Sequence, residues 1–491
     1  MSSKKTKGLS RRRFINAAAA GGVGLAGVAV LAGCGETQVV EVVKEVPVET
    51  VKEVVKEVPV VEERVVTKEV QKVVEKIVTV EAMPAKPQAL TLVFATWWAL
   101  ERGGFGRYEQ KYMDVFEAQN PHITMEYCNW PWAEFHTKLL TQAAAGTAPD
   151  AFAHSNVFYP KYVKRGGALA LDEFVKTNVE FDIDDFLPVS LKLSTVDGKL
   201  YGLPHISSAW GIIYNKQVME DAGITESPND LDARGEWNWE SNLEMLKKLT
   251  KRDSDGKAER LGQADPGLRF RSSHQWAWQN GGEALKQPTL DEFVLNEPAS
   301  AEAVQWIADS FNVHKVTATA ADLIGGSRSD LNNGRLGMIY TWFNFSAHKD
   351  QPVDIVYPPA GPVNRVTILH TNSLGVSTSS KYPDEATEYI ALQTSKQGDV
   401  DQINFGMGIV LRRSNLADMT RINKADFGID HAEVVGEVIE TGRVFDINEF
   451  HQETLDAVNP VMEEIRDGAP AKEKLDEIKP VVDDILAPMR G

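Results

Sequence analysis

From residue 90 onward, short apolar runs alternate with stretches in which apolar residues recur at helical spacing. The first part of this region predicts three strands separated by two helices: strands at 90–96, 123–130 and 150–155, and helices at 108–120 and 133–146, the second closed by Gly146. This order favours a parallel sheet with right-handed crossovers. Ligands of such sheets bind at the carboxyl ends of the strands. The pattern therefore predicts an α/β fold and indicates where a site would lie.

Two adjacent tryptophans, Trp97 and Trp98, follow the first predicted strand, and residues 154–156 end the third. Neighbouring side chains of an extended chain point to opposite faces, so the two indoles cannot both enter one core. We expect at least one of them to face a ligand cleft; ordinary packing at a strand end is the alternative. About 400 residues exceed what one core usually accommodates, so two lobes are expected.

The first 33 residues have the pattern of an export signal. Ser10–Ile15 resembles a twin-arginine motif, and a run of about 17 small apolar residues follows, which is short for a membrane span. Leu31–Cys34 resembles a bacterial lipobox, in which the peptide is cut before the cysteine and the thiol carries a lipid. We expect residues 1–33 to be a signal peptide and Cys34 to be lipidated. An uncleaved apolar anchor with a chance cysteine is the alternative.

Residues 34–89 form a low-complexity segment of Val, Glu and Lys, in which EVVKEVPV occurs at 41–48 and again at 53–60. The repetitive part contains no aromatic residue and cannot build a core of its own. We predict a tether that reaches about 150 Å when fully extended. An oligomerising stalk is the alternative, although the valines keep no clean heptad. The proline-free part, 61–81, could be locally helical or paired as a strand.

Composition excludes several classes of function. The chain is 43% hydrophobic and 25% charged, with a formal net charge of −18, which argues against nucleic acid or a basic membrane-binding patch. Its two cysteines, Cys34 and Cys128, are not expected to form a disulfide. The metalloprotease, redox, nucleophile-elbow and phosphate-loop motifs do not occur. Residues 253–256 resemble the start of a calcium loop but lack its final glutamate, so a plain turn is expected. We therefore expect no enzyme activity, metal or cofactor.

Seven phrases resemble, in order, the family 1 extracellular solute-binding proteins of ABC transporters, of the maltose-binding type. They are AAAGTAPDAFA (143–153), GGALALDEF (166–174), DGKLYGLPHISSAWGIIYNK (197–216), WNWESNLEMLKKLTKRDSDGKAERLG (237–262), WQNGGEAL (278–285), NNGRLGMIYTW (332–342) and KYPDEATEYIALQTS (381–395). The resemblance covers nearly everything after residue 90. Leu411 departs from it, because a proline often precedes the basic residues there.

The resemblance implies a two-lobe α/β fold in residues 90–491 that closes on a ligand like a hinge. One lobe would comprise about 91–203 and 357–403, and the other about 204–356 and 404–491. The stretches 203–204 and 357–359 would be hinge crossings. The implied protein is a monomer without enzymatic activity, anchored on the outer face of the cytoplasmic membrane, that hands a mono- or oligosaccharide to ABC transporter permease subunits.

Candidate contacts follow from the chemistry of a sugar, since an indole covers its apolar face and amides or hydroxyls meet its rim. The tryptophans near presumed cleft loops are Trp97, Trp98, Trp210, Trp278 and Trp342, and the polar candidates are Asn156, Ser207, Asn280, Asn344 and Asn372. Asp150 is equally consistent with a buried structural carboxylate and a ligand acceptor. We expect Trp306 in the core and Trp237 and Trp239 at a helix start. Few unpaired Lys or Arg are evident near the cleft, which favours a neutral ligand.

Two other classes of function remain open. A secreted cell-surface carbohydrate hydrolase could use carboxylates scattered along the chain, because spacing alone cannot identify such a pair. A stalked adhesin or structural surface protein is suggested by the tether. Turnover of oligosaccharides would select the hydrolase, and absence of any small ligand would favour the adhesin. The sequence does not indicate which sugar is bound.

Overall fold

The computed structural model describes residues 88–101, 103–407 and 409–490. The predictions for the signal peptide, for Cys34 and for most of the tether therefore lie outside the described residues. No helix of the described part is both long and apolar enough to span a bilayer.

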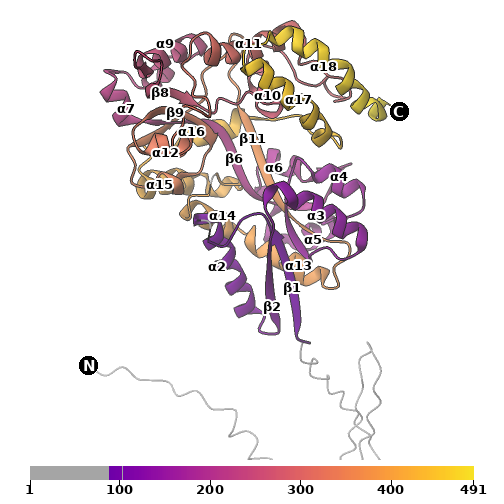
Figure 1. Ribbon diagram of the computed structural model, residues 1–491. Helices are drawn as coiled ribbons and strands as arrows, with labels where there is room; N and C mark the ends of the chain where they lie inside the picture. The colour runs from indigo at the N-terminus through magenta and orange to yellow at the C-terminus, as the bar shows by residue number, and fades with distance from the viewer. Residues whose placement is uncertain (1–87, 102, 408, 491) are drawn as a thin grey trace, which may run out of the picture. The chain divides into compact units, whose positions relative to one another are not determined.

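The first lobe is built around a parallel sheet, as the hydrophobic pattern predicts (Figure 1). Strand β1 pairs in parallel with both β2 and β3. The elements are β1 (Leu90–Thr96), α2 (Gly103–Gln119), β2 (Ile123–Asn129), α3 (Trp132–Ala145) and β3 (Ala151–Ser155). Gly146 ends α3 in the left-handed conformation, with φ of 69°, which a residue without a side chain adopts at little cost. All five predicted elements are confirmed, with shifts of a few residues at their ends.

Further short elements complete this lobe. They are α4 (Tyr159–Lys164), α5 (Asp172–Thr177), the 3₁₀ turns η1 (Val179–Phe181) and η2 (Ile183–Asp185), α6 (Pro188–Leu193), β4 (Thr195–Val196), β5 (Lys199–Leu200), α13 (Pro383–Gln393) and α14 (Lys396–Asn404). The core combines aromatic residues of α2 with residues of β1, β6, β11 and α13. A smaller apolar cluster lies between α3, β3 and α4.

Two strands, β6 (Gly202–Asn215) and β11 (Ile368–Val376), carry the sheet from one lobe into the other (Figure 1). The strand order is β2-β1-β3-β11-β6-β9-β8-β7. The final part of β11 pairs with β3, whereas the final part of β6 pairs with β9 (Leu336–Trp342) and β10 (Val353–Val356) of the second lobe. A continuous ladder through both lobes gives the crossing a defined geometry.

The two predicted crossings lie in different surroundings. Leu203 and Pro204 lie in β6, but Tyr357 remains with the second lobe. Its carbonyl accepts the indole N–H of Trp237, and its hydroxyl bonds to Thr441. About ten residues later, in β11, the chain pairs with β3 of the first lobe, and the lobe boundary at 357 stays a prediction.

The second lobe surrounds β7–β10 with helices. Its elements are α7 (Lys216–Asp221), α8 (Pro228–Ala233), α9 (Trp239–Leu249), β7 (Lys251–Arg252), β8 (Ala258–Ala264), α10 (Phe270–Gln279), α11 (Pro298–Asn312), α12 (Ser327–Asn332), η3 (Phe345–Ala347), η4 (Arg413–Asn415), α15 (Leu416–Phe427), α16 (Val434–Thr441), β12 (Arg443–Val444), α17 (His451–Arg466), α18 (Ala471–Leu486) and η5 (Ala487–Arg490). Residues 253–256 form the β7–β8 turn, where the Asp253 carboxylate accepts two backbone N–H groups, as expected for a plain turn.

Tryptophans fasten this lobe as the sequence predicts. Asn238, which lies between Trp237 and Trp239, caps α9 and forms a reciprocal capping box with Ser241. Trp306 stacks on Trp239 with ring centroids 4.5 Å apart and packs against the core of the lobe. These interactions place α9 and α11 against α10, the helix whose first turn enters the site.

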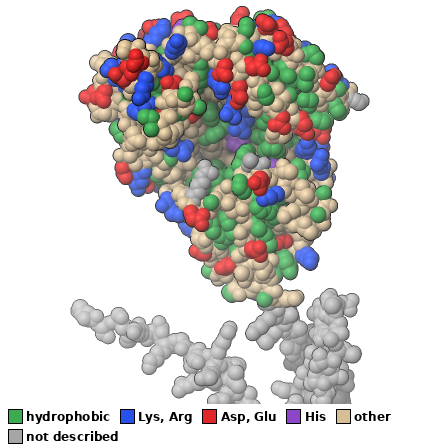
Figure 2. Space-filling model, viewed as in Figure 1, with side chains coloured by type: hydrophobic (Ala, Val, Ile, Leu, Met, Phe, Trp, Pro, Cys, Tyr) green, Lys and Arg blue, Asp and Glu red, His purple; other side chains and the backbone are tan. Residues whose placement is uncertain are grey.

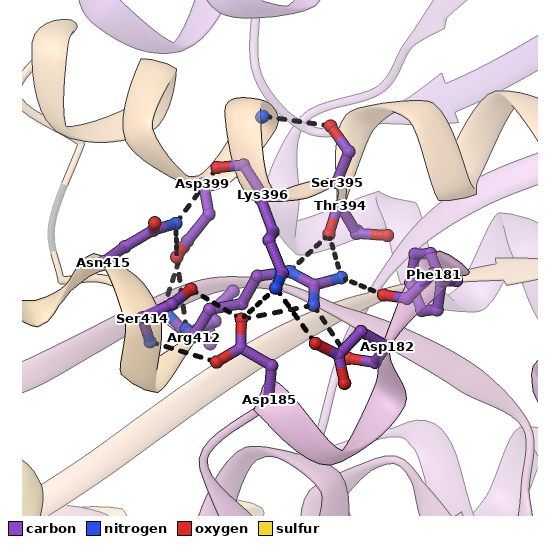
Figure 3. Close-up of polar contacts among 12 residues, drawn as sticks. Phe181, Asp182, Asp185, Thr394, Ser395, Lys396, Asp399, Arg412, Ser414 and Asn415 are labelled. Atoms are coloured by element: carbon purple, nitrogen blue, oxygen red, sulfur yellow. Dashed lines mark hydrogen bonds and ion pairs between the residues drawn. The ribbon is translucent and has the colours of Figure 1, made fainter. Parts of the chain in front are cut away.

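A buried arginine, Arg412, fixes another contact between the lobes (Figure 3). Its guanidinium donates to the carbonyl oxygens of Phe181, Asp182 and Thr394. The Asp399 carboxylate accepts the backbone N–H groups of Leu411 and Arg412, at 2.8 and 3.1 Å. The turn at Leu411 thus depends on N–H donors, one of which a proline would lack.

Candidate functional site

The site is a cleft with two adjoining cavities, of about 600 and 240 Å³. Segments of β6, β9 and the loop before α10 line the larger one. The smaller one lies between Trp132, Val157 and Phe158 of the first lobe and α10 and α17 of the second. Arg269 and Arg271 line both cavities. Figure 2 shows a hollow in this face, in which basic and histidine side chains gather beside hydrophobic ones.

An aromatic wall forms one side of the larger cavity. Trp342, at the end of β9, is paired in register with Trp210 on β6, and their ring centroids lie 5.0 Å apart at 73°. Tyr340 lies two residues before Trp342, so strand alternation places it on the same face. All three line the cavity. The Trp210 indole N–H and the Tyr340 hydroxyl are buried and have no hydrogen-bond partner within the described residues.

Two arginines at the start of α10 correct the expectation of few unpaired cations. Arg271 lies 5.8 Å from the Trp342 ring centroid and 5.5 Å from that of Phe445. Burial, and then the charge of Arg269, lower the pKa of Arg271 to about 10, so it stays protonated at neutral pH. Burial is also the main cause that lowers the pKa of nearby His370 to about 3, which leaves that imidazole neutral. The cleft therefore carries positive charge.

The tryptophan doublet does not divide as strand alternation predicts, because both residues lie in a bend after β1, their ring centroids are 4.5 Å apart, and Trp97 packs against the same core cluster as Trp98. Trp98 is buried in the core of the first lobe and stacks on Phe105. Trp97 is half-buried and contacts Trp132 and His136 of α3, with ring centroids 4.9 and 5.6 Å away. Neither lines the two cavities, whereas Trp132, 42% exposed, lines the smaller one. Trp97 thus lies behind Trp132, and its role at the cleft stays a prediction.

Three polar candidates gather where the crossing strands meet. Ser207 on β6 hydrogen bonds to the carbonyl oxygen of His370 and to the Thr371 hydroxyl. Asn372 on β11 bonds to the His370 ring at 3.0 Å. Asn156 follows β3, and its buried amide nitrogen has no partner among the described residues. These side chains lie beside the cleft but do not line the cavities, so ligand contact stays a prediction for them.

Four other candidates are engaged in structural bonds. Asp150 accepts the Val93 backbone N–H and the Ser380 hydroxyl, which favours the structural interpretation of this carboxylate. Trp278 is a core residue, because its indole, 1% exposed, donates to Glu283. The remaining bonds join Asn280 to the carbonyl oxygen of Ala299 and Asn344 to the Ser346 hydroxyl. None of the four lines either cavity.

Sequence reasoning identified Trp210 and Trp342 but missed several other residues that line the cleft. Arg269, Arg271, Tyr340 and Trp132 line it and were not candidates. The segment GLRFRSSHQW contains a signal, since two arginines two residues apart open a helix after a glycine turn. Apolar, stacking and hydrogen-bonding surfaces suit recognition of a solute. Within the described residues, no cluster of three His, Cys, Asp or Glu side chains could hold a metal ion.

Known proteins share this fold and sequence pattern. The chain is 29% identical over 296 residues to a putative binding protein of Brucella abortus. The aligned region covers 57% of this chain and 67% of that protein. The chain is 33% identical over 112 residues to the diacetylchitobiose binding protein DasA of Streptomyces coelicolor, covering 21% of this chain and 25% of the relative.

An ABC substrate-binding protein from Listeria monocytogenes, solved in complex with cycloalternan, superposes with a TM-score of 0.71 at 22% identity, covering 82% of this chain and all of that one. This likeness confirms the two-lobe fold. The profile of the family described as "Bacterial extracellular solute-binding protein" matches residues 102–400, more than half of the chain. The chain therefore belongs to the family of bacterial extracellular solute-binding proteins.

Proposed function

We propose that the protein captures a carbohydrate in the cleft and delivers it to an ABC importer. The observation that carries the proposal is the paired indoles of Trp210 and Trp342 in the wall of the larger cavity. An indole face matches the apolar face of a pyranose, and the unpaired Trp210 N–H and Tyr340 hydroxyl next to it suit sugar hydroxyls. A relative named for diacetylchitobiose and a neighbour in complex with cycloalternan add support.

In this proposal the protein performs no chemistry, and closure of the lobes is the signal to the permease. The smaller cavity has walls from both lobes, so a ligand that extends into it touches both. Such a ligand binds the closed form better than the open form, which is what shifts the equilibrium towards closure. We propose that the protein does this as a monomer, with the cleft lined by residues of both lobes.

A thermal-shift screen of oligosaccharides on the full-length protein tests the proposal, followed by calorimetric titration of the ligands that bind. Trp342→Ala should lower the affinity by about 2 kcal/mol or more with little loss of stability, as for an aromatic hot spot. The matched control is Trp306→Ala, which removes a half-buried indole that lines neither cavity and should cost stability without changing affinity. Turnover of a bound oligosaccharide would contradict the proposal in favour of a hydrolase, and absence of any small ligand would favour an adhesin.

We further propose that export by the twin-arginine route and a lipid on Cys34 place the domain on the outer face of the membrane, with residues 34–89 as a tether. Cys34→Ser should release the protein from membranes. Retention through residues 17–33 would show a helical anchor instead. Replacing Arg11 and Arg12 by lysine should stop export, whereas unchanged export would assign the general secretory route.

A further inference from the structure

We infer that the ligand of this cleft is an acidic sugar derivative, whose oxyanion, a carboxylate or a phosphate, binds Arg271 and Arg269 at the start of α10. This inference rests on the proposed function and adds the charge of the ligand to it. It replaces the neutral ligand that the sequence favours.

The first support is the position of Arg271. It lines both cavities, and its guanidinium lies between the rings of Trp342 and Phe445, at 5.8 and 5.5 Å from their centroids. Among the described residues it has no carboxylate partner and no side-chain hydrogen bond, and it contacts the faces of these two rings. Burying a guanidinium without a counter-ion is costly, and a bound oxyanion would offset that cost with a bidentate, charge-assisted pair.

The second support is the contrast with neighbouring arginines. Arg466, which also lines the larger cavity, is paired with Asp467 at 3.0 Å. Arg443, on β12, is held by Glu283 at 3.1 Å. The folded chain thus supplies carboxylates to arginines around the cleft but none to Arg271. Arg269, which is exposed, adds a second unpaired guanidinium within the described residues.

Helix α10 supplies a third component. The N–H of Phe270 donates to the Asn459 side chain, but the N–H groups of Arg271 and Ser272 have no acceptor among the described residues. Ser272 lines the same cavity. Free N–H groups and the positive end of the helix dipole favour an anion at this end of α10, where both arginines line the cavities.

Two carboxylates, of Asp265 and Asp467, also line the larger cavity, but Asp467 is paired with Arg466, and neither forms an ion pair with Arg271 or Arg269 in the described structure. The pKa values of His370 and His451, lowered to about 3 chiefly by burial, keep both imidazoles neutral. Asp265 is exposed in the wall of the larger cavity, and it suits sugar hydroxyls as an acceptor. An acidic sugar therefore fits the cleft with its ring on the aromatic wall and its oxyanion at Arg271.

The test measures affinity in three matched ligand series at low ionic strength. Each neutral oligosaccharide of the screen is compared with its C6-oxidised uronate and its 6-phosphate on the full-length protein. One acidic series should bind at least tenfold more tightly than the neutral parents, and its identity tells a carboxylate from a phosphate. Arg271→Gln should abolish this preference, and Arg271→Lys should keep part of it. Arg443→Gln, which removes a paired arginine that lines neither cavity, should leave it unchanged.

Each contrary result has a separate meaning. Neutral parents that bind as tightly as both acidic series would overturn the inference and leave carbohydrate capture intact. An acidic preference that survives in Arg271→Gln would overturn the assignment to Arg271. Failure of every series to bind would refute the proposed function itself. If Arg271→Gln has a lowered melting temperature, the affinities for acidic and neutral ligands are compared instead in Arg271→Lys and in Arg269→Gln, whose site is exposed.

Discussion

Glu109→Gln should raise stability at neutral and alkaline pH, because Glu109 is fully buried on α2 of the first lobe. Gln393 donates to one carboxyl oxygen at 3.2 Å, and the other oxygen has no partner among the described residues. Burial raises the pKa of Glu109 from 4.5 to about 8, an effect that the bond from Gln393 only partly offsets. The folded protein therefore holds a proton at pH 7 that the unfolded chain has lost.

The sign and size of the effect follow from linkage. Between pH 4.5 and 8 the native state binds one proton more than the unfolded state, so stability falls as pH rises. The slope is about 1.4 kcal/mol per pH unit, which amounts to about 3 kcal/mol by pH 7. A glutamine keeps the shape and carries no titrating proton, so Glu109→Gln should remove this slope.

Chemical denaturation of the wild type and the variant at pH 5, 6, 7 and 8 measures the difference directly. The difference in unfolding free energy between the variant and the wild type should widen as pH rises. All other titrating groups are the same in both proteins, so this widening reports on Glu109 alone. Glu126→Gln, on the exposed face of β2, is the matched control and should track the wild type. Parallel pH profiles for Glu109→Gln and the wild type would refute the reasoning, because they would show that Glu109 is ionised in the folded state.

Three further predictions concern other buried groups. Burial lowers the pKa of four histidines to about 3, namely His136, His205, His370 and His451. They stay neutral in the folded protein but gain protons in the unfolded chain, so stability should fall as pH drops below 6.5. His205→Leu should make that fall shallower in the same denaturation assay. Arg412→Lys should cost about 3 kcal/mol or more in unfolding free energy, since one ammonium cannot serve the carbonyls that the guanidinium joins; an unchanged denaturation midpoint would contradict this. Trp98→Ala should cost about 3–5 kcal/mol, whereas Trp132→Ala, at an exposed indole, should leave the melting temperature nearly unchanged; similar losses would contradict the assignment of Trp98 to the core.

Local pattern predicted the first lobe well because its strands and helices are short, regular and closed by clear signals. The glycine after α3 and the apolar run of β1 illustrate this, and the family phrases supplied the two-lobe fold. The second crossing, predicted at 357–359, stays a prediction, because the sequence does not show the hydrogen bonds that join Tyr357 to Trp237 and Thr441.

The candidate site was harder to predict, because accessibility and pairing are tertiary properties. Trp278 and Trp342 look alike in sequence, yet Trp278 is enclosed beneath Arg443, which comes from β12, far along the chain. Asp265 and Arg269 are four residues apart, a spacing that would pair them on a helix. A turn with φ of 55° at Asp265 and 80° at Gly267 intervenes before α10, and no ion pair joins the two in the described structure.

Hydrogen exchange of the full-length protein, with and without the tightest ligand of the screens, tests the central claim most directly. If a carbohydrate closes the two lobes, one ligand should protect segments on both sides of the cleft. These are residues 132–158 of the first lobe and 265–272 and 340–342 of the second. Protection confined to one lobe, or absent from the cleft while the ligand is bound, would contradict capture by closure.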